Sequence, residues 1–172
     1  MSNTVGSWAL AAELEKDIDI MAGYVVNDQS CLTLRRSYIR AVLSALEGVL
    51  YTLREDIIRH GDLGSFSPKQ RAKLLEKVYR NGVVQSADKY LPLEEAIKFM
   101  PKCFARHMGI KGFEFPHGDE GWARMKEAIR IRNKITHPKC LNDLNVSVAD
   151  LATVATAKVW FKERVSSQLI VP

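Results

Sequence analysis

The stretch from residue 33 to residue 60 carries an apolar pattern that is typical of one long helix. Its apolar side chains recur at intervals of 4, 4, 3, 4 and 4 positions, at Tyr38, Val42, Leu46, Val49, Leu53 and Ile57. This period places them on one face of an α-helix, whereas a half-buried strand would alternate every second residue. A helix of this length must cover its apolar face with other elements, so the pattern predicts a helical bundle.

The remaining segments also carry helical signals. Ser7 is a candidate N-cap, and Ser67-Pro68-Lys69-Gln70 has the order of a capping box with proline at the first helical position. Pro101 is expected to kink or split its helix. Further helices are expected over about 8–24, 67–81, 92–107, 119–136 and 147–167.

No stretch shows strand alternation, so we expect an all-α, single-domain bundle of about five to six helices without a sheet. A chain of 172 residues has room for one ordinary domain. Residues 1–30 are expected to form an acidic N-terminal helix or extension, and residues 31–168 the helical domain.

The charge is unevenly distributed. The chain has 25 Lys and Arg against 20 Asp and Glu, and residues 35–140 hold 21 of these basic groups but only 12 of the acidic ones. Such a region can attract a polyanion, although on charge alone a solvated protein surface is the favoured interpretation. The N-terminus lacks the features of a signal peptide, no apolar run is long enough for a membrane span, and three cysteines at wide spacing suggest reduced thiols. We therefore expect a cytoplasmic protein that does not bind membranes.

Some potential metal ligands occur in the sequence. Cys103 and His107 are four residues apart, and His117 or Cys140 could join them. A second pair at ligand spacing is missing, so a buried thiol and a surface histidine are the favoured interpretation, and neither a metal nor a cofactor is expected.

Two phenylalanines lie in the expected loop 111–118. Phe113 and Phe115 could stack on nucleobases. The favoured alternative is that they hold the loop onto the bundle as apolar contacts.

The helix expected over 119–136 contains a charged residue where an apolar one belongs. On a helical projection that starts from Trp122, Arg132 falls at about 280°, within the arc of apolar side chains. A guanidinium there needs a partner, because burying it unpaired costs several kcal/mol. It could form an ion pair with Glu47 of the long helix, or extend its head to solvent. Alternatively, this part of the arc faces a shared cleft or a dimer interface.

Two more polar residues follow Arg132 at the end of this helix. Asn133 and His137 are four apart and lie along one side, whereas Arg132 and His137 would diverge by about 140° on a regular helix. Pro138 disfavours helical backbone angles at His137, so this residue can leave the helix and change direction.

The run RNKITHP, residues 132–138, resembles the signature of the HEPN superfamily of all-α domains. Ribonucleases of this superfamily carry Arg, often followed by a polar residue, and then His after four to six residues. Arg132, Asn133 and His137 match that order. Arg54 and His60 have the same spacing, but they end the long helix and are interpreted as part of a solvated face.

The resemblance implies a metal-independent endoribonuclease that acts as a toxin or defence effector. His137 would be the general acid or base and Arg132 would hold the phosphate, while Asn133 would orient Arg132 or a phosphate oxygen. The family's cleft between subunits implies a homodimer whose interface includes helix 119–138, and an antitoxin or another protein partner is possible. Flanking phosphates of the RNA would be bound by Arg124, Arg130, Lys134 and Lys139.

Cleavage of this kind would leave a 2′,3′-cyclic phosphate and a free 5′-hydroxyl. The rival hypothesis is a non-catalytic helical module of the same fold that binds nucleotide, RNA or a protein.

Related toxins that are controlled by nucleotidyl transfer often carry Tyr two residues after the His, and here Lys139 takes that place.

Overall fold

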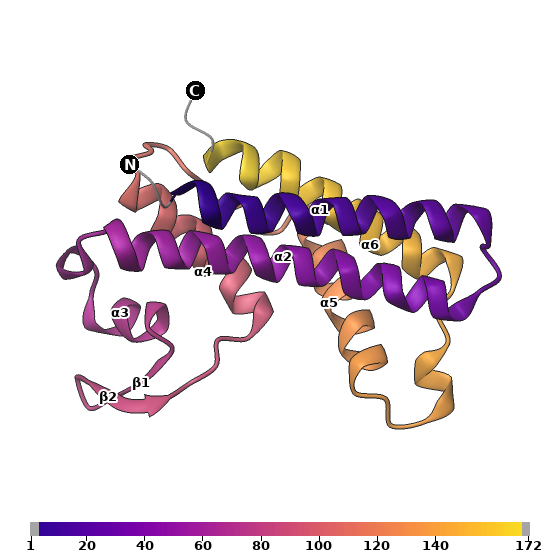
Figure 1. The fold of residues 1–172 in the computed structure, drawn as a ribbon. Helices are drawn as coiled ribbons and strands as arrows, with labels where there is room; N and C mark the ends of the chain where they lie inside the picture. Colours follow the sequence, from indigo (N-terminus) through magenta and orange to yellow (C-terminus); the bar gives the residue numbers. More distant parts are fainter. Residues whose placement is uncertain (1–3, 170–172) are drawn as a thin grey trace.

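The fold is a bundle built around the long helix that the sequence predicts. The computed structural model describes residues 4–169 and shows six α-helices, short 3₁₀ turns and one small hairpin in that range (Figure 1). The elements in order are α1 Thr4–Asn27, α2 Leu32–His60, η1 Leu63–Ser65, α3 Pro68–Leu74, β1 Lys77–Arg80, β2 Val83–Asp88, α4 Leu93–His107, α5 Glu120–Thr136, η2 Leu141–Leu144, α6 Val148–Arg164 and η3 Ser166–Leu169. The predominantly α-helical single domain is confirmed.

The helix starts follow capping chemistry in several places. The Ser67 side chain accepts from the backbone N–H of Gln70 to begin α3, and Ser147 forms the same capping box with Asp150 at α6. Both starts agree with the sequence. Ser7 does not cap α1, because that helix begins at Thr4 and Ser7 lies inside it. Pro101 does not split α4, which continues through it.

The secondary structure predicted from the sequence is wrong between residues 75 and 88. The helix expected over 67–81 ends at Leu74, and an antiparallel hairpin of β1 and β2 follows. Asn81 and Gly82 form its turn with φ angles of 51° and 79°. Positive φ at both central residues is the type I′ geometry that Asn-Gly favours between strands, so the Asn-Gly pair marks a turn and not merely a helix end. The expectation of a fold without a sheet therefore fails at this hairpin.

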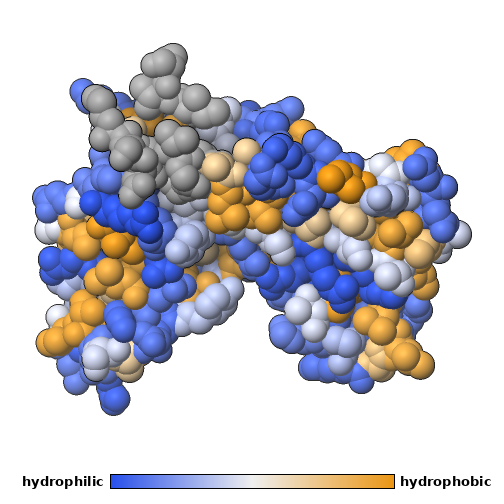
Figure 2. All heavy atoms as spheres, in the orientation of Figure 1, coloured by the Kyte–Doolittle hydropathy of each residue, from blue (hydrophilic) through white to orange (hydrophobic). Residues whose placement is uncertain are grey.

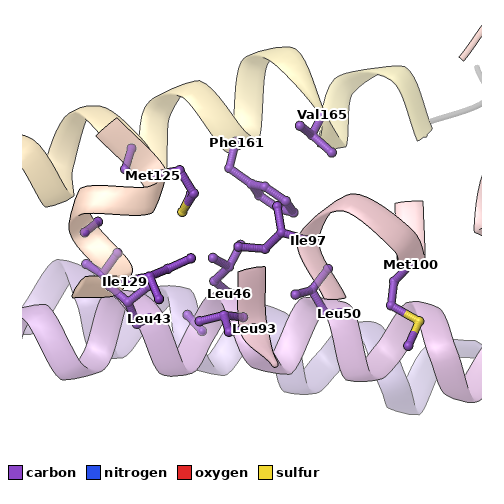
Figure 3. Close-up of a cluster of buried hydrophobic side chains, with 14 of the residues drawn as sticks. Leu43, Leu46, Leu50, Leu93, Ile97, Met100, Met125, Ile129, Phe161 and Val165 are labelled. Atoms are coloured by element: carbon purple, nitrogen blue, oxygen red, sulfur yellow. The ribbon is translucent and has the colours of Figure 1, made fainter. Parts of the chain in front are cut away.

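The core lies where α2, α4, α5 and α6 meet (Figure 3). Leucines of α2 pack against Leu93 and Ile97 of α4, while Met125 of α5 and Phe161 of α6 close the other side. These side chains have less than a tenth of their surface exposed. The apolar spacing of α2 is thus satisfied by three helices that lie far apart in the sequence.

The acidic helix α1 packs lengthwise on α2 and reaches α6 (Figure 1). Glu15 pairs with Lys162 at 3.0 Å, and Asp19 lies 3.8 Å from Lys158. The hydrogen bond from Lys162 is the main reason that the pKa of Glu15 is lowered. Within residues 4–169, no helix is long and apolar enough to cross a membrane.

Candidate functional site

Helix α5 is anchored at its start by Asp119. One carboxylate oxygen of Asp119 accepts from the backbone N–H of Trp122 at 2.7 Å, and the other accepts from the indole N–H of Trp160 at 2.9 Å. The N-cap is therefore also a tether to α6. This double contact fixes the direction of α5 and, with it, the position of its C-terminal turn.

Ile131 and Ile135 are buried on the core side of that turn, and Arg132 lies between them in the sequence. The Arg132 Nη2 contacts Glu47 Oε1 on α2, and Nη1 donates to Asn133 Oδ1 at 3.1 Å. The ion pair that was one of the sequence-based alternatives for Arg132 is present. It joins the middle of α2 to the end of α5.

The pair is not sealed inside the bundle. The Arg132 side chain keeps 20% of its surface exposed and the Glu47 side chain 33%. The Arg132 side chain is therefore mostly buried, yet both partners of the pair keep contact with solvent. An incoming anion can therefore approach the guanidinium without unfolding the helix.

His137 ends α5 as the sequence predicts. Its φ and ψ angles of −125° and 62° are not helical, while its backbone N–H still donates to the carbonyl oxygen of Asn133 at 2.9 Å. The clash with Pro138 explains this departure. The imidazole is exposed and makes no hydrogen bond or ion pair with any residue in the described range. Arg132 and Asn133 are thus in contact with each other. The ring of His137, which is four residues further along the chain from Asn133, has no partner among the described residues.

Basic residues of α2 hold the last turn of α5 and the segment that follows it, in both cases through backbone carbonyl groups. Arg40 donates to the carbonyl of Ile135 at 2.8 Å, and Arg36 donates to that of Leu144 at 2.9 Å. Carbonyls at a helix C-terminus carry partial negative charge, so a guanidinium there is favourable. These arginines belong to no motif in the sequence, although their spacing of four on α2 places them on one face.

The four residues expected to bind flanking phosphates divide into two pairs. Arg124 contacts Glu120 at 3.0 Å and Arg130 contacts Glu127 at 2.5 Å, both within α5. The second contact lowers the pKa of Glu127. The other two residues of the set are Lys134 and Lys139. They make no ion pair in the part of the chain that the structure describes. These lysines are the cations more readily available to an anion.

Arg54 does not belong to a solvated face. Its Nε donates to the carbonyl of Leu74 at 2.7 Å and its Nη1 to Glu76 at 2.8 Å, so it fastens the hairpin to α2. In the Arg54–His60 match to the ribonuclease pattern, the arginine therefore has a structural role.

The cysteine and histidine residues do not assemble into a metal site. Cys103 is buried, and burial raises the pKa of its thiol to about 12. His107 instead pairs with Asp56 at 3.2 Å, and His117 lies 3.1 Å from the Lys102 Nζ. Among the described residues, no group of three or more metal-ligating side chains forms.

Of the two loop phenylalanines, Phe115 is a core residue. It is buried, and its ring packs edge-on against the rings of Trp122 and Trp160, with ring centroids 5.2 Å and 6.0 Å apart. Phe113 packs against the same core in a partly buried position. The expectation of apolar contacts is confirmed for this loop.

A comparison with protein-family models, with curated proteins and with solved structures finds no match to this chain.

Proposed function

We propose that the protein is a metal-independent endoribonuclease of the HEPN type, a toxin or defence effector that works as a homodimer in the cytoplasm. The observation that carries the proposal is the end of α5. There an arginine whose side chain is one-fifth exposed is held in place by Glu47, touches Asn133, and is followed by a histidine whose ring is exposed and without a partner in the described chain.

RNA cleavage suits this set because the substrate supplies its own nucleophile. The 2′-hydroxyl attacks the adjacent phosphorus, its proton leaves to a base, and the 5′-oxygen of the next nucleotide departs with a proton. An imidazole can accept or donate a proton and so perform either transfer, and a pair of sites in a dimer could perform both. The products are a 2′,3′-cyclic phosphate and a 5′-hydroxyl.

Arg132 would bind the phosphate and stabilise the charge that develops on it. A guanidinium offers a planar pair of N–H donors, which matches two phosphate oxygens. Asn133 Oδ1 accepts from the Arg132 Nη1 and so orients the fork. Lys134 and Lys139 would attract neighbouring phosphates, and no cofactor enters the reaction.

The Arg132–Glu47 contact also supports a second candidate function. An arginine already paired with a carboxylate is less available to a phosphate, which favours a non-catalytic module that binds nucleotide, RNA or a protein partner such as an antitoxin.

One experiment separates the two functions. Purified protein is incubated with single-stranded RNA in EDTA, and the ends of the fragments are identified by mass spectrometry. The proposal predicts cleavage with 2′,3′-cyclic phosphate ends. Cleavage only after metal is added would refute the mechanism, and binding without any cleavage would support the module.

A further inference from the structure

A pocket lies directly beside the candidate site, on the other side of Glu47. Figure 2 shows this face of the molecule hollowed between two lobes, one bearing α3 and the hairpin, the other bearing the end of α5 and η2. A pocket of about 370 Å³ opens between α2 and the segment that leads from β2 into α4. This volume lies in the range of small-molecule sites.

Two tyrosines stand at the rim of the pocket. Tyr51 of α2 is 50% exposed and Tyr90, which follows β2, is 69% exposed. In the described part of the chain, neither ring packs against another aromatic ring or forms a hydrogen bond. Exposed aromatic rings at the edge of a pocket can stack on a planar ligand.

The pocket floor is apolar and its edge is charged. Buried leucine and methionine side chains form the floor, at Leu50, Leu91, Leu93 and Met100. The edge carries Glu47, Arg54 and Glu76. Glu47 contacts Arg132 through Oε1, and Glu76 accepts from Arg54 through Oε2, so each carboxylate has one oxygen without a protein donor in the described range.

We infer that this pocket binds one nucleobase of single-stranded RNA, and that it prefers guanine. A base is flat, apolar on its faces and polar at its edge, which matches aromatic rims, an apolar floor and a charged border. Guanine presents two adjacent N–H donors on its Watson–Crick edge, and the free oxygens of Glu47 and Glu76 are acceptors. The inference rests on the proposed function only in naming RNA as the source of the base.

Because Glu47 borders the pocket and also holds Arg132, a base bound here places its own backbone next to the guanidinium. The pocket therefore selects which phosphate lies at the candidate site. Tyr51 and Tyr90 are specificity-determining residues on this account, and they take no part in proton transfer.

The test is calorimetric titration of the protein with the four nucleoside monophosphates. We expect GMP to bind most tightly. Replacing Tyr51 or Tyr90 by Ala should weaken GMP binding about 5- to 150-fold, the range found for a lost base–aromatic stack. Tyr24→Ala is the matched control, because Tyr24 is 55% exposed on α1 and does not line the pocket.

The inference is overturned if GMP does not bind, if both rim variants bind it like wild type, or if ribose 5-phosphate binds as tightly as GMP. Equal affinity for all four nucleotides overturns the guanine preference. Circular dichroism establishes that each variant is folded, and Tyr90 provides a second site if Tyr51→Ala unfolds. A dimer that dissociates in Tyr51→Ala while GMP affinity is unchanged would assign the rim to a second copy of the chain and overturn the inference.

The binding test is independent of catalysis. It uses GMP, which has no internucleotide phosphodiester bond to cleave. If GMP binds through the tyrosines but no RNA is cleaved, the proposed function fails and the pocket assignment stands.

Discussion

The contact between Arg132 and Glu47 can be measured as a coupling energy. We consider Glu47→Gln, which removes the charge, and Arg132→Met, which keeps most of the apolar stem. Exposed ion pairs contribute about 0.2–1 kcal/mol, whereas breaking a buried pair costs about 3–5 kcal/mol. Here one partner is one-fifth exposed and the other one-third exposed, so solvent screens the pair in part. We expect a coupling of about 1–2 kcal/mol.

The assay is urea unfolding of wild type, both single variants and the double variant. In a chain of this length, the expected coupling corresponds to roughly 2–8 °C in melting temperature. Glu13 and Lys16 provide the control cycle, because their side chains are 68% and 65% exposed and should couple by less than about 0.5 kcal/mol. A coupling below about 0.3 kcal/mol at Arg132 would be indistinguishable from additivity and would refute the conclusion that Glu47 holds the guanidinium.

Three further outcomes are expected. Gly121→Ala should destabilise the protein by about 1–3 kcal/mol in chemical unfolding, because its new methyl group would collide with the buried Trp160 ring. Gly23→Ala is the control, since open space surrounds Gly23 and the change should be neutral or stabilising. Equal effects of the two substitutions would contradict the packing of Gly121 against Trp160. Affinity for single-stranded RNA should fall about 50-fold between 50 and 200 mM salt if about four phosphates are neutralised, and a salt-independent affinity would rule this mode out. Iodoacetamide at pH 8 should modify the exposed Cys140 long before Cys103, because the raised pKa keeps the buried Cys103 thiol protonated. Mass spectrometry measures the labelling of both cysteines, and faster labelling of Cys103 would show that it is not buried.

The sequence predicts the helices well where signals are local. The spacing along α2, the Ser67 and Ser147 caps and the effect of Pro138 on His137 all depend on residues within a few positions of one another. The hairpin is also encoded locally, in Asn81-Gly82 between Val78-Tyr79 and Val83-Val84, but a helical interpretation of the preceding leucines obscures it.

Only part of the candidate site can be predicted from the sequence. An arginine in an apolar arc needs a partner or a path to solvent, and Glu47 of the long helix is one candidate partner. The pocket beside it could not be found in the same way, since Tyr51 and Tyr90 are brought together by the chain path through the hairpin. Contacts between residues that far apart leave no periodic signal in the sequence.

The most direct test of the central claim is the single-turnover rate of RNA cleavage in EDTA by wild type, His137→Ala and His60→Ala. His60 is the matched control, because it is likewise an exposed histidine at the end of a helix. We predict that His137→Ala lowers the rate by about 100-fold or more, the usual contribution of a general acid or base, while its melting temperature and RNA affinity stay close to those of wild type. His60→Ala should cleave at the wild-type rate. Wild-type cleavage by His137→Ala, or an equal loss in both variants, would contradict the assignment of the end of α5 as the catalytic site.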